Sequence, residues 1–419
     1  MRTVPAKPWI PREPGPDITF INASVVDVEA GRIIPDSSAR IADGLIADVA
    51  TGNYTRPSSS TVVNLQGQYI CPGLIDCHVH LTATPGSTAL RDMFSASPTS
   101  LAYRAAYVAR EMLLRGFTTV RDTGGADAAL RDAIADGLVP GPRLLIAGKA
   151  LSQTGGHGDS RATYQGDELR FALRRGADFI KIMCGGGVAS PSDALDMVQF
   201  TAEEIQAITR TAAYSGKYVT AHCYTVDAIR HAVDNGVRGI EHGNFIDRET
   251  AEYCRDKGVT FTPTLATYYG MTQPEFSHFL DDASQRKNQE VLRGGLDALT
   301  ILRDAGVTMC YGSDLLAGLH PLQNREFGIR AAVLGAGEIL RSATVNAAKY
   351  LGMEGKLGCV RKGSIADMLI LKANPLEDIT VLDRIEESLV GLLKDGRVVT
   401  HRLDGLSVDP LYDPFRIQQ

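Results

Sequence analysis

The 419-residue sequence has few of the features that mark membrane, nucleic-acid-binding or disulfide-rich proteins. It contains a single tryptophan, and its seven cysteines include no CxxC pair. The cysteines are odd in number and mostly lie inside apolar runs, so we expect reduced thiols in a hydrophobic core. A disulfide framework and a zinc knuckle are therefore both disfavoured.

Charge of one sign and long apolar stretches are also lacking. The formal net charge is −6, and lysine and arginine are scattered without a basic cluster, which disfavours nucleic acid as a partner. No stretch approaches the ~18 unbroken apolar residues of a membrane span. Residues 1–16 carry charge and proline where a secretory signal needs an apolar core. We expect a cytoplasmic protein that acts on a small molecule.

The two ends of the chain share one pattern. Between residues 17 and 68, short alternating segments are broken by Gly, Pro, Asp and Asn, and the residues after 352 read in the same way. Such a pattern is typical of small antiparallel strands. We therefore expect residues 1–68 and 353–419 to pair into one small β-sandwich.

The middle of the chain, residues 69–352, alternates short apolar runs with amphipathic helical stretches. This alternation is typical of a parallel sheet with crossover helices, and eight such repeats predict a closed (β/α)8 (TIM) barrel. The eight apolar runs are residues 69–80, 118–122, 143–148, 178–183, 218–224, 239–243, 260–265 and 308–314.

Polar side chains lie at the ends of these runs, where a barrel places its chemistry. His78 and His80 are two residues apart, so on a strand both side chains project to the same face. A single buried histidine is usually a satisfied core side chain. Two imidazoles on the same face of an apolar strand would each need a hydrogen-bond partner. This requirement weakens the interpretation as core side chains and favours metal binding. The other polar residues at run ends are Lys181, His222, His242 and Asp314.

Four imidazoles and one carboxylate are enough ligands for a metal centre, but they do not neutralise two dications. Lys181, in FIKIM, is a candidate for the missing anion because an apolar site lowers the pKa of an amine, and the free amine can add carbon dioxide. A salt bridge from Lys181 to a neighbouring carboxylate, such as that of Asp314, is the alternative. Asp314, in YGSD, could also serve as a helix cap instead of a metal ligand.

These motifs resemble a known family. PGLIDCHVHL, the lysine in FIKIM, HCYT, EHGN and GSD are similar to the amidohydrolase superfamily, in its binuclear branch with a carboxylated lysine. The likeness implies two divalent cations on His78, His80, Lys181, His222, His242 and Asp314, bridged by N-carboxylated Lys181. Zinc is the metal we expect from imidazole-rich ligation, although manganese, cobalt or iron would fit the same ligands.

Further motifs, including GGHGD and HCYTVDAI, are most similar to Xaa-Pro dipeptidases and ochratoxin-cleaving amidohydrolases within that superfamily. The resemblance implies that His157 positions or polarises the scissile carbonyl and that Tyr224 contacts the substrate. Asp314 would take a proton from the bridging water and pass it to the leaving group. His320, in the loop after Asp314, is a further candidate substrate contact. GGHGD could instead be only a glycine-rich turn, and Tyr224 only a cover of the barrel mouth.

The predicted reaction is hydrolysis of an amide, in an N-acyl amino acid or a dipeptide with an apolar C-terminal residue, including ochratoxin-like amides. Opening of a cyclic amide or lactone, as in imidazolonepropionase, is the alternative on the same ligands. A scaffold protein without catalysis is disfavoured because all six ligand positions are present. The resemblance also implies a homo-oligomer. The segment between Asp159 and Lys181 is short and is expected to hold one helix, RFALRRG, where relatives often carry a longer covering loop.

Overall fold

The computed structural model of the chain describes residues 15–52, 60–86, 96–153, 156–157, 176–190 and 193–412. The helix expected at RFALRRG falls largely in 158–175, outside the described residues. No helix within the described ranges is both long enough and apolar enough to cross a membrane.

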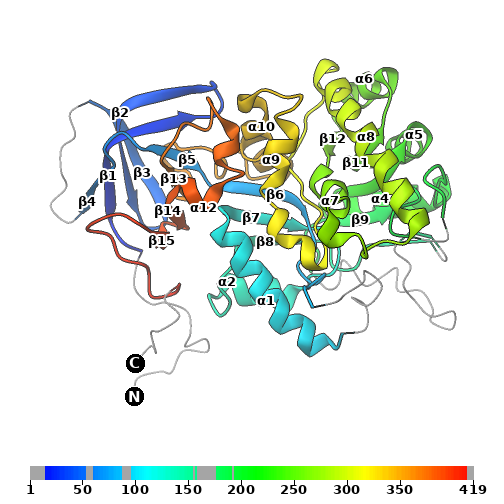
Figure 1. The fold of residues 1–419 in the computed structure, drawn as a ribbon, viewed down its shortest axis with the longest axis horizontal. Coiled ribbons are helices and arrows are strands. Elements are labelled where there is room, and N and C mark those ends of the chain that lie inside the picture. Colours follow the sequence, from blue (N-terminus) through cyan, green and yellow to red (C-terminus); the bar gives the residue numbers. More distant parts are fainter. Residues whose placement is uncertain are drawn as a thin grey trace.

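The described strands, labelled as in Figure 1, are β1 Ile18–Asp27, β2 Arg32–Ala42, β3 Leu45–Thr51, β4 Thr61–Asn64, β5 Tyr69–Pro72, β6 Leu74–Val79, β7 Phe117–Asp122, β8 Arg143–Ile146, β9 Ile180–Met183, β10 Val219–Thr225, β11 Gly239–Phe245, β12 Thr260–Thr262, β13 Met368–Leu371, β14 Leu389–Lys394 and β15 Arg397–His401. The α-helices are α1 Pro98–Leu114, α2 Ala128–Ala135, α4 Ala202–Tyr214, α5 Val226–Asp234, α6 Arg248–Asp256, α7 Leu265–Met271, α8 Asp282–Asp304, α9 Arg325–Arg330, α10 Ala336–Ser342, α11 Val345–Tyr350 and α12 Ile385–Ser388. The 3-10 helices are η2 Pro274–Phe276, η3 Ala317–Leu322 and η4 Ile379–Val381.

The two ends of the chain share one eight-stranded sheet, at the left of Figure 1. Its strands follow the order β15-β14-β13-β5-β1-β2-β3, and β4 pairs with β1. Strand β5 joins the two ends, because it runs parallel to β1 and antiparallel to β13, with Ile70 opposite Ile370. Apolar side chains from both ends form a separate buried cluster, which includes Phe20, Ile41 and Leu393. Burial of this shared core stabilises the pairing of the two ends.

The middle of the chain forms two parallel sheets, β6-β7-β8 and β9-β10-β11-β12. Hydrogen bonds connect the two sheets at both edges. At one edge Leu151 bonds to the β9 backbone at Lys181 and Met183, and at the other the segment 308–311 bonds to Phe261 of β12 and Cys77 of β6. The protein is thus α/β, with helices covering the parallel strands (Figure 1).

Two of the eight apolar runs differ from expectation. The first run forms two strands, because the chain leaves the end sheet at Pro72 and enters the parallel sheet at Leu74. Gly73 allows this passage, since a Cβ at this position would lie 2.2 Å from Thr118 Oγ1. The eighth run, 308–314, makes an isolated bridge at Met309 instead of a regular strand. Its backbone nevertheless bonds to strands on both sides.

Helix ends follow local signals. Thr201 caps α4 in a reciprocal capping box with Glu204, which satisfies two backbone N–H groups at the start of the helix. Gly216 and Gly258 follow α4 and α6 with φ of 66° and 69°, a conformation that a glycine adopts without strain.

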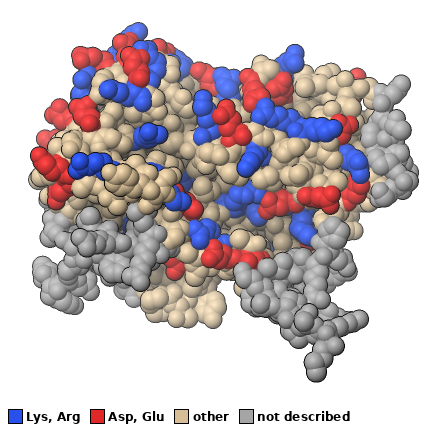
Figure 2. All heavy atoms as spheres, turned by 180° about the vertical axis from the view of Figure 1, so that it is seen from behind, with Lys and Arg blue, Asp and Glu red and all other residues tan. Residues whose placement is uncertain are grey.

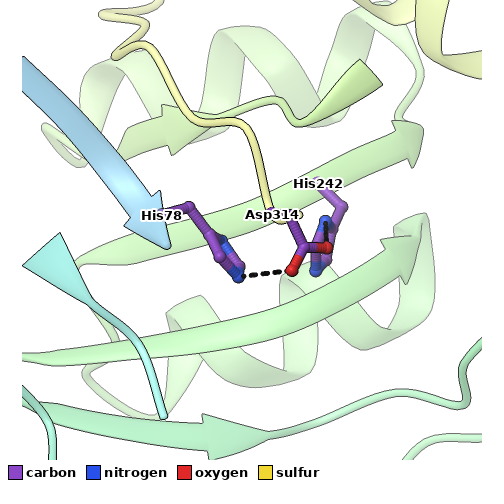
Figure 3. Close-up of side chains that lie close together, drawn as sticks. All are labelled: His78, His242 and Asp314. Atoms are coloured by element: carbon purple, nitrogen blue, oxygen red, sulfur yellow. Dashed lines mark ion pairs between the residues drawn. The ribbon is translucent and has the colours of Figure 1, made fainter. Parts of the chain in front are cut away.

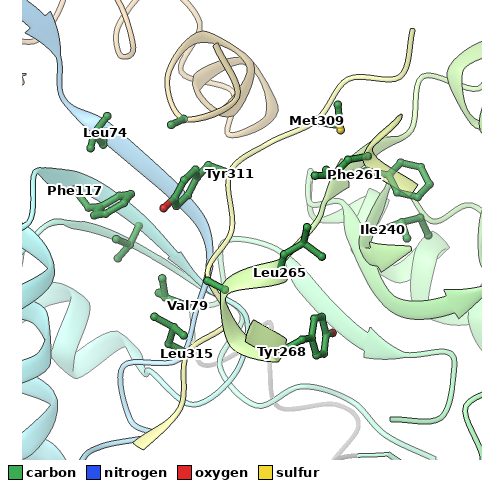
Figure 4. Packing of buried hydrophobic residues seen from close by; sticks show 14 of the residues in the cluster. Leu74, Val79, Phe117, Ile240, Phe261, Leu265, Tyr268, Met309, Tyr311 and Leu315 are labelled. Atoms are coloured by element: carbon green, nitrogen blue, oxygen red, sulfur yellow. The ribbon is translucent and has the colours of Figure 1, made fainter. Parts of the chain in front are cut away.

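The main core lies between the parallel sheets and their helices. Figure 4 shows Leu74, Phe117 and Tyr311 on one side of this core and Ile240 and Phe261 on the other. All seven cysteines are free and buried, as expected for core thiols. On the face shown in Figure 2, acidic and basic side chains are interspersed. The polar side chains at the ends of the parallel strands contrast with this apolar core.

Candidate metal centre

Two histidines lie at the end of strand β6. His78 belongs to the strand and is buried, whereas His80 follows it and is partly exposed. Their ring centroids are 5.3 Å apart, with an angle of 69° between the ring planes. The alternation of side chains along the strand thus brings both imidazoles to one side.

Asp314 meets this pair from the segment that closes the parallel sheets. Its Oδ1 atom lies 3.3 Å from His78 Nε2 and 3.1 Å from His80 Nε2. Burial acts to raise the pKa of Asp314, but the two imidazoles outweigh it and hold the pKa well below the ordinary value. Asp314 adopts a φ of 53°, and its N–H donates to the His78 carbonyl at 2.8 Å. The carboxylate is therefore ionised and fixed beside both rings.

His222 and His242 come from the neighbouring strands β10 and β11. Their ring centroids are 4.6 Å apart, and the His242 ring lies 5.1 Å from that of His78. One ligand atom from each of His78, His242 and Asp314 lies within 4.8 Å of the others, and Figure 3 shows these three side chains converging. Burial lowers the pKa of both His222 and His242 well below the ordinary value. The two rings are thus neutral, which is the form that binds metal ions.

Each of these four imidazoles has one ring nitrogen held by an oxygen. His78 Nδ1 bonds to Glu241 Oε2 at 2.8 Å, His80 Nδ1 to the Gly124 carbonyl at 2.8 Å, and His222 Nε2 to the Gly186 carbonyl at 2.9 Å. Carboxylate and carbonyl oxygens only accept hydrogen bonds, so the other nitrogen of these three rings is the unprotonated one in the neutral form. His242 Nδ1 lies 2.7 Å from the Thr264 hydroxyl. This pattern is typical of histidines that bind metals.

Lys181 lies on β9 beside these rings. It is 2% exposed, and burial lowers the pKa of its amine. Its charge is among those that lower the pKa of His222 and His242. Among the described residues, no ion pair within 4 Å joins Lys181 to Asp314 or to another carboxylate, so the salt bridge considered as an alternative is not formed there. A buried amine without that partner fits the chemistry of carboxylation.

Several residues that organise the centre were missed by the sequence analysis. Asp76 accepts from the His78 N–H and from Ser313, and Asp122 accepts from the backbone at Leu81 and Gly124. Asp76 lies inside the PGLIDCHVHL motif and Asp122 is the last residue of the run 118–122, and these positions are the signal that the sequence offers for them. Glu241 directly precedes His242, and Arg121 is buried in β7.

His157 lies beside the centre. Its ring stacks on His222 at 4.5 Å, and burial lowers its pKa. Gly187 makes room for the ring, since a Cβ there would lie 1.9 Å from His157 Cε1. His157 Nδ1 lies 3.7 Å from the buried carboxylate of Asp193, and its backbone N–H donates to Gln199 at 3.1 Å. The contacts hold His157 against the imidazole cluster.

Tyr224 is the penultimate residue of strand β10 and lies close to the same cluster. Its ring lies 4.7 Å from His222, and its hydroxyl is 2.9 Å from that of Tyr268. The Tyr268 hydroxyl in turn lies 3.0 Å from His242 Nδ1. Burial raises the pKa of both phenols, so both keep their protons and can donate hydrogen bonds. Tyr268, in the sequence LATYYG, was also missed by the sequence analysis.

His320 is less directly placed. Its Nε2–H donates to the Ala83 carbonyl at 2.8 Å, and it is 4% exposed. It also lines a cavity of about 560 Å³ with residues of α1, α12, β14 and β15, among them Glu111, Val390 and His401. None of the six candidate metal ligands lines that cavity.

Comparison with known proteins agrees with this geometry. Residues 69–407 match the model of the amidohydrolase family. Ochratoxinase from Aspergillus niger is 30% identical over 404 residues, covering 87% of this chain and 83% of the ochratoxinase.

Two crystal structures are similar over nearly the whole chain. One is an amidohydrolase with 38% identity and a TM-score of 0.88, covering 93% of this chain and all (100%) of that one. The other is a prolidase in complex with N-methylphosphonate-L-proline, with 37% identity and a TM-score of 0.87, covering 92% of this chain and 100% of the prolidase. Such similarity extends over both the end sheet and the parallel sheets.

Proposed function

Because this chain belongs to the amidohydrolase family and is a hydrolase of carbon–nitrogen bonds, we propose that it cleaves the amide bond of N-acyl amino acids or dipeptides. The single observation that carries the proposal is the cluster of four histidines, each with one nitrogen held by an oxygen, around Asp314 and beside Lys181.

The proposal includes the finer architecture. The two parallel sheets and the 308–314 segment close into a (β/α)8 barrel, as hydrogen bonds at both edges support, and the end sheet forms a β-sandwich. The proposed limits are residues 1–68 and 353–419 for the sandwich and 69–352 for the barrel, although the first residues of the middle segment, β5 Tyr69–Pro72, pair with the end sheet. Strand β5 adds its backbone pairing to the sandwich sheet.

The family is generally metal-dependent, and we propose two divalent cations, with zinc as the expected metal. His78, His80, His222, His242 and Asp314 would hold them, and Lys181, carboxylated on its amine, would bridge them. The donor set of neutral imidazoles, an ionised aspartate and a buried amine suits such a centre. When bound, the metal pair supplies Lewis acidity and lowers the pKa of water.

Side chains of this chain carry out the proton transfer and position the substrate. Asp314 accepts a proton from the attacking water and delivers it to the departing amine, since its carboxylate faces the cluster in ionised form. His157, stacked on His222, donates to the oxygen of the scissile carbonyl as negative charge develops there. The Tyr224 hydroxyl donates to the substrate carboxylate, and His320, in η3, is a second substrate contact.

The relatives support the proposed substrate class. Ochratoxinase and the prolidase bound to an L-proline derivative support an amide whose leaving group is an amino acid. An apolar C-terminal residue is the expected leaving group, and ochratoxin-like amides belong to the same class.

The experiment that tests this function combines metal analysis with hydrolysis. Metal content per chain is measured by elemental analysis for the wild type, Lys181→Ala and the exposed control Lys257→Ala. Each protein is assayed on N-acyl amino acids, dipeptides, a cyclic amide and a lactone. We expect about two metals and amide hydrolysis in the wild type and the control, and loss of both in Lys181→Ala.

Other results would redirect the proposal. Preference for the cyclic amide or the lactone would show the alternative reaction on the same ligands, and a metal-free, inactive wild type would indicate a scaffold protein. One metal in an active wild type would contradict the bridging lysine. Light scattering on the same preparation tests the expected homo-oligomer.

A further inference from the structure

The four histidines of the centre differ in what holds them. His80 and His222 donate to neutral backbone carbonyls, and His242 contacts a hydroxyl. Among the described residues, His78 is the one histidine of the four whose second ring nitrogen, the one turned away from Asp314, bonds to a carboxylate: its Nδ1 lies 2.8 Å from Glu241 Oε2. A carboxylate acceptor makes an imidazole a stronger electron donor than a neutral acceptor does. His78 is therefore electronically distinct within the cluster.

The Glu241 carboxylate accepts hydrogen bonds from three side chains. Its Oε1 atom accepts from Arg121 Nη2 at 2.5 Å and from the Thr220 hydroxyl, while Oε2 accepts from His78. Both Glu241 and Arg121 have side chains with 0% exposure. Four strands, β6, β7, β10 and β11, each contribute one member of this network. The carboxylate thus has little freedom to turn away from His78.

Arg121 is fixed equally firmly. Its Nε atom donates to the Cys77 carbonyl, one residue before His78, and Nη1 donates to the Tyr218 hydroxyl at 3.3 Å. The guanidinium packs over the rings of Phe179 and Tyr350 at 4.8 and 4.7 Å. The positive charge of Arg121 compensates the negative charge of Glu241. The carboxylate can therefore stay ionised although it is buried beside His78.

A second buried pair shows what a purely structural role looks like. Glu326 and Arg330 are also fully buried and joined at 2.7 Å. The remaining oxygen of Glu326 accepts from the backbone N–H of Ala266. In Glu241 the corresponding oxygen bonds instead to a histidine of the cluster, which a structural role does not require.

From these contacts we infer that Glu241, held by Arg121 and Thr220, is a positioning residue that gives the cation site containing His78 a higher affinity than the other site. Glu241 retains the proton on His78 Nδ1 and directs the unprotonated Nε2 toward Asp314, 3.3 Å away. The inference rests on the metal centre of the proposed function. It predicts two unequal sites, filled in sequence.

Glu241→Gln tests this role directly. A glutamine keeps the shape but has one donor end, so it cannot accept from both Arg121 and His78. If the glutamine NH2 donates to His78 Nδ1, that nitrogen must be unprotonated. The proton of the neutral ring then lies on Nε2, the nitrogen that would face the cation. We expect the affinity of one zinc site to fall by about 10- to 100-fold, with the other site changed less.

The affinities are measured by competition with a fluorescent zinc chelator, using zinc alone and apo-protein whose fold is checked by circular dichroism. Glu326→Gln is the matched control, because it makes the same change in a buried Glu–Arg pair without a histidine. We expect the control to lose stability and to keep both zinc affinities.

Wild-type zinc affinities in folded Glu241→Gln would overturn the inference, and so would an equal loss in Glu326→Gln. If Glu241→Gln does not fold, Thr220→Val removes one donor to Glu241 and should weaken the same site, and unchanged binding in that variant would overturn the inference. Because zinc binding is read without substrate, failure to cleave amides is distinguished from failure of this role. A wild type that binds no zinc would overturn both the proposed metal centre and the role of Glu241.

Discussion

Asp76 and Ser313, 237 residues apart, are joined twice: the carboxylate of Asp76 accepts from the Ser313 hydroxyl at 2.6 Å and from its backbone N–H at 3.2 Å. Asp76 also accepts from the backbone N–H of His78, while Ser313 directly precedes Asp314. One buried carboxylate therefore sets the distance between the first histidine and the aspartate of the candidate centre.

This link predicts the effect of Asp76→Asn. All the contacts of the Asp76 carboxylate are with donors, so the amide end of an asparagine would face a donor and leave it unsatisfied. We expect a loss of about 1–3 kcal/mol in the free energy of unfolding and a lower metal content. Urea unfolding and elemental analysis measure the two effects. Unchanged metal content in the folded variant would contradict the link, and Ser313→Ala, which removes only one donor, should show a smaller effect.

The close packing of His157 on Gly187 gives a second prediction. In Gly187→Ala the new methyl group would overlap the imidazole, so either the ring or the backbone must move. We expect kcat for amide hydrolysis to fall by about 10- to 100-fold, because moving the imidazole misaligns the group that we propose contacts the reacting carbonyl.

Gly185→Ala is the matched control for this substitution. The nearest atoms to a Cβ at Gly185 are 3.6 Å away, an ordinary contact. Equal losses of kcat in both variants would show that the glycine segment tolerates no side chain, and the specific role of His157 would then be rejected.

The position of Tyr224 predicts a selective change in substrate binding. Tyr224→Phe removes a hydroxyl that is 2.9 Å from Tyr268 but keeps the ring that packs on His222. If this hydroxyl binds the substrate carboxylate, KM should rise about tenfold or more, since hydrogen bonds to charged groups contribute about 1.5–3 kcal/mol. Steady-state kinetics on a substrate and on its C-terminal amide, which lacks the charge, measure the difference. The same rise in KM for both compounds would argue against carboxylate recognition.

His320 predicts how stability depends on pH. Burial and the nearby Arg115 lower its pKa from 6.5 to about 4, although the bond to Ala83 opposes them. Between these values the unfolded chain binds the proton more strongly, so stability rises with pH across this window and is lost as pH falls. Through this group alone, the free energy of unfolding is about 3 kcal/mol higher at pH 7 than at a pH below the folded pKa.

His320→Gln provides the measurement, because glutamine can still donate to the Ala83 carbonyl but does not titrate. Urea unfolding at pH 7 and pH 4.5 should show a smaller acid loss in the variant than in the wild type. Parallel pH dependences in the two proteins would exclude His320 as the source of the acid sensitivity.

The sequence predicted the features that depend on local periodicity. Apolar runs and amphipathic stretches indicated the alternating α/β order, and the spacing of His78 and His80 indicated two side chains on one face of a strand. The family was recognisable because its motifs are short and contiguous, and the match over residues 69–407 confirms the family. Residues at the ends of predicted strands could be named because the ends of parallel strands gather on one side of a sheet.

Tertiary structure alone decided how those residues are held. Glu241 meets His78 across 163 residues, and nothing in the EHG motif specifies that partner. The break at Gly73 depends on contact with Thr118, and the bridge at Met309 depends on Phe261. Local sequence sets which face a side chain occupies, but hydrogen-bond partners and close approaches arise from strands brought together by burial of the core. For that reason the candidate ligands could be read from the sequence, whereas the network that orients them could not.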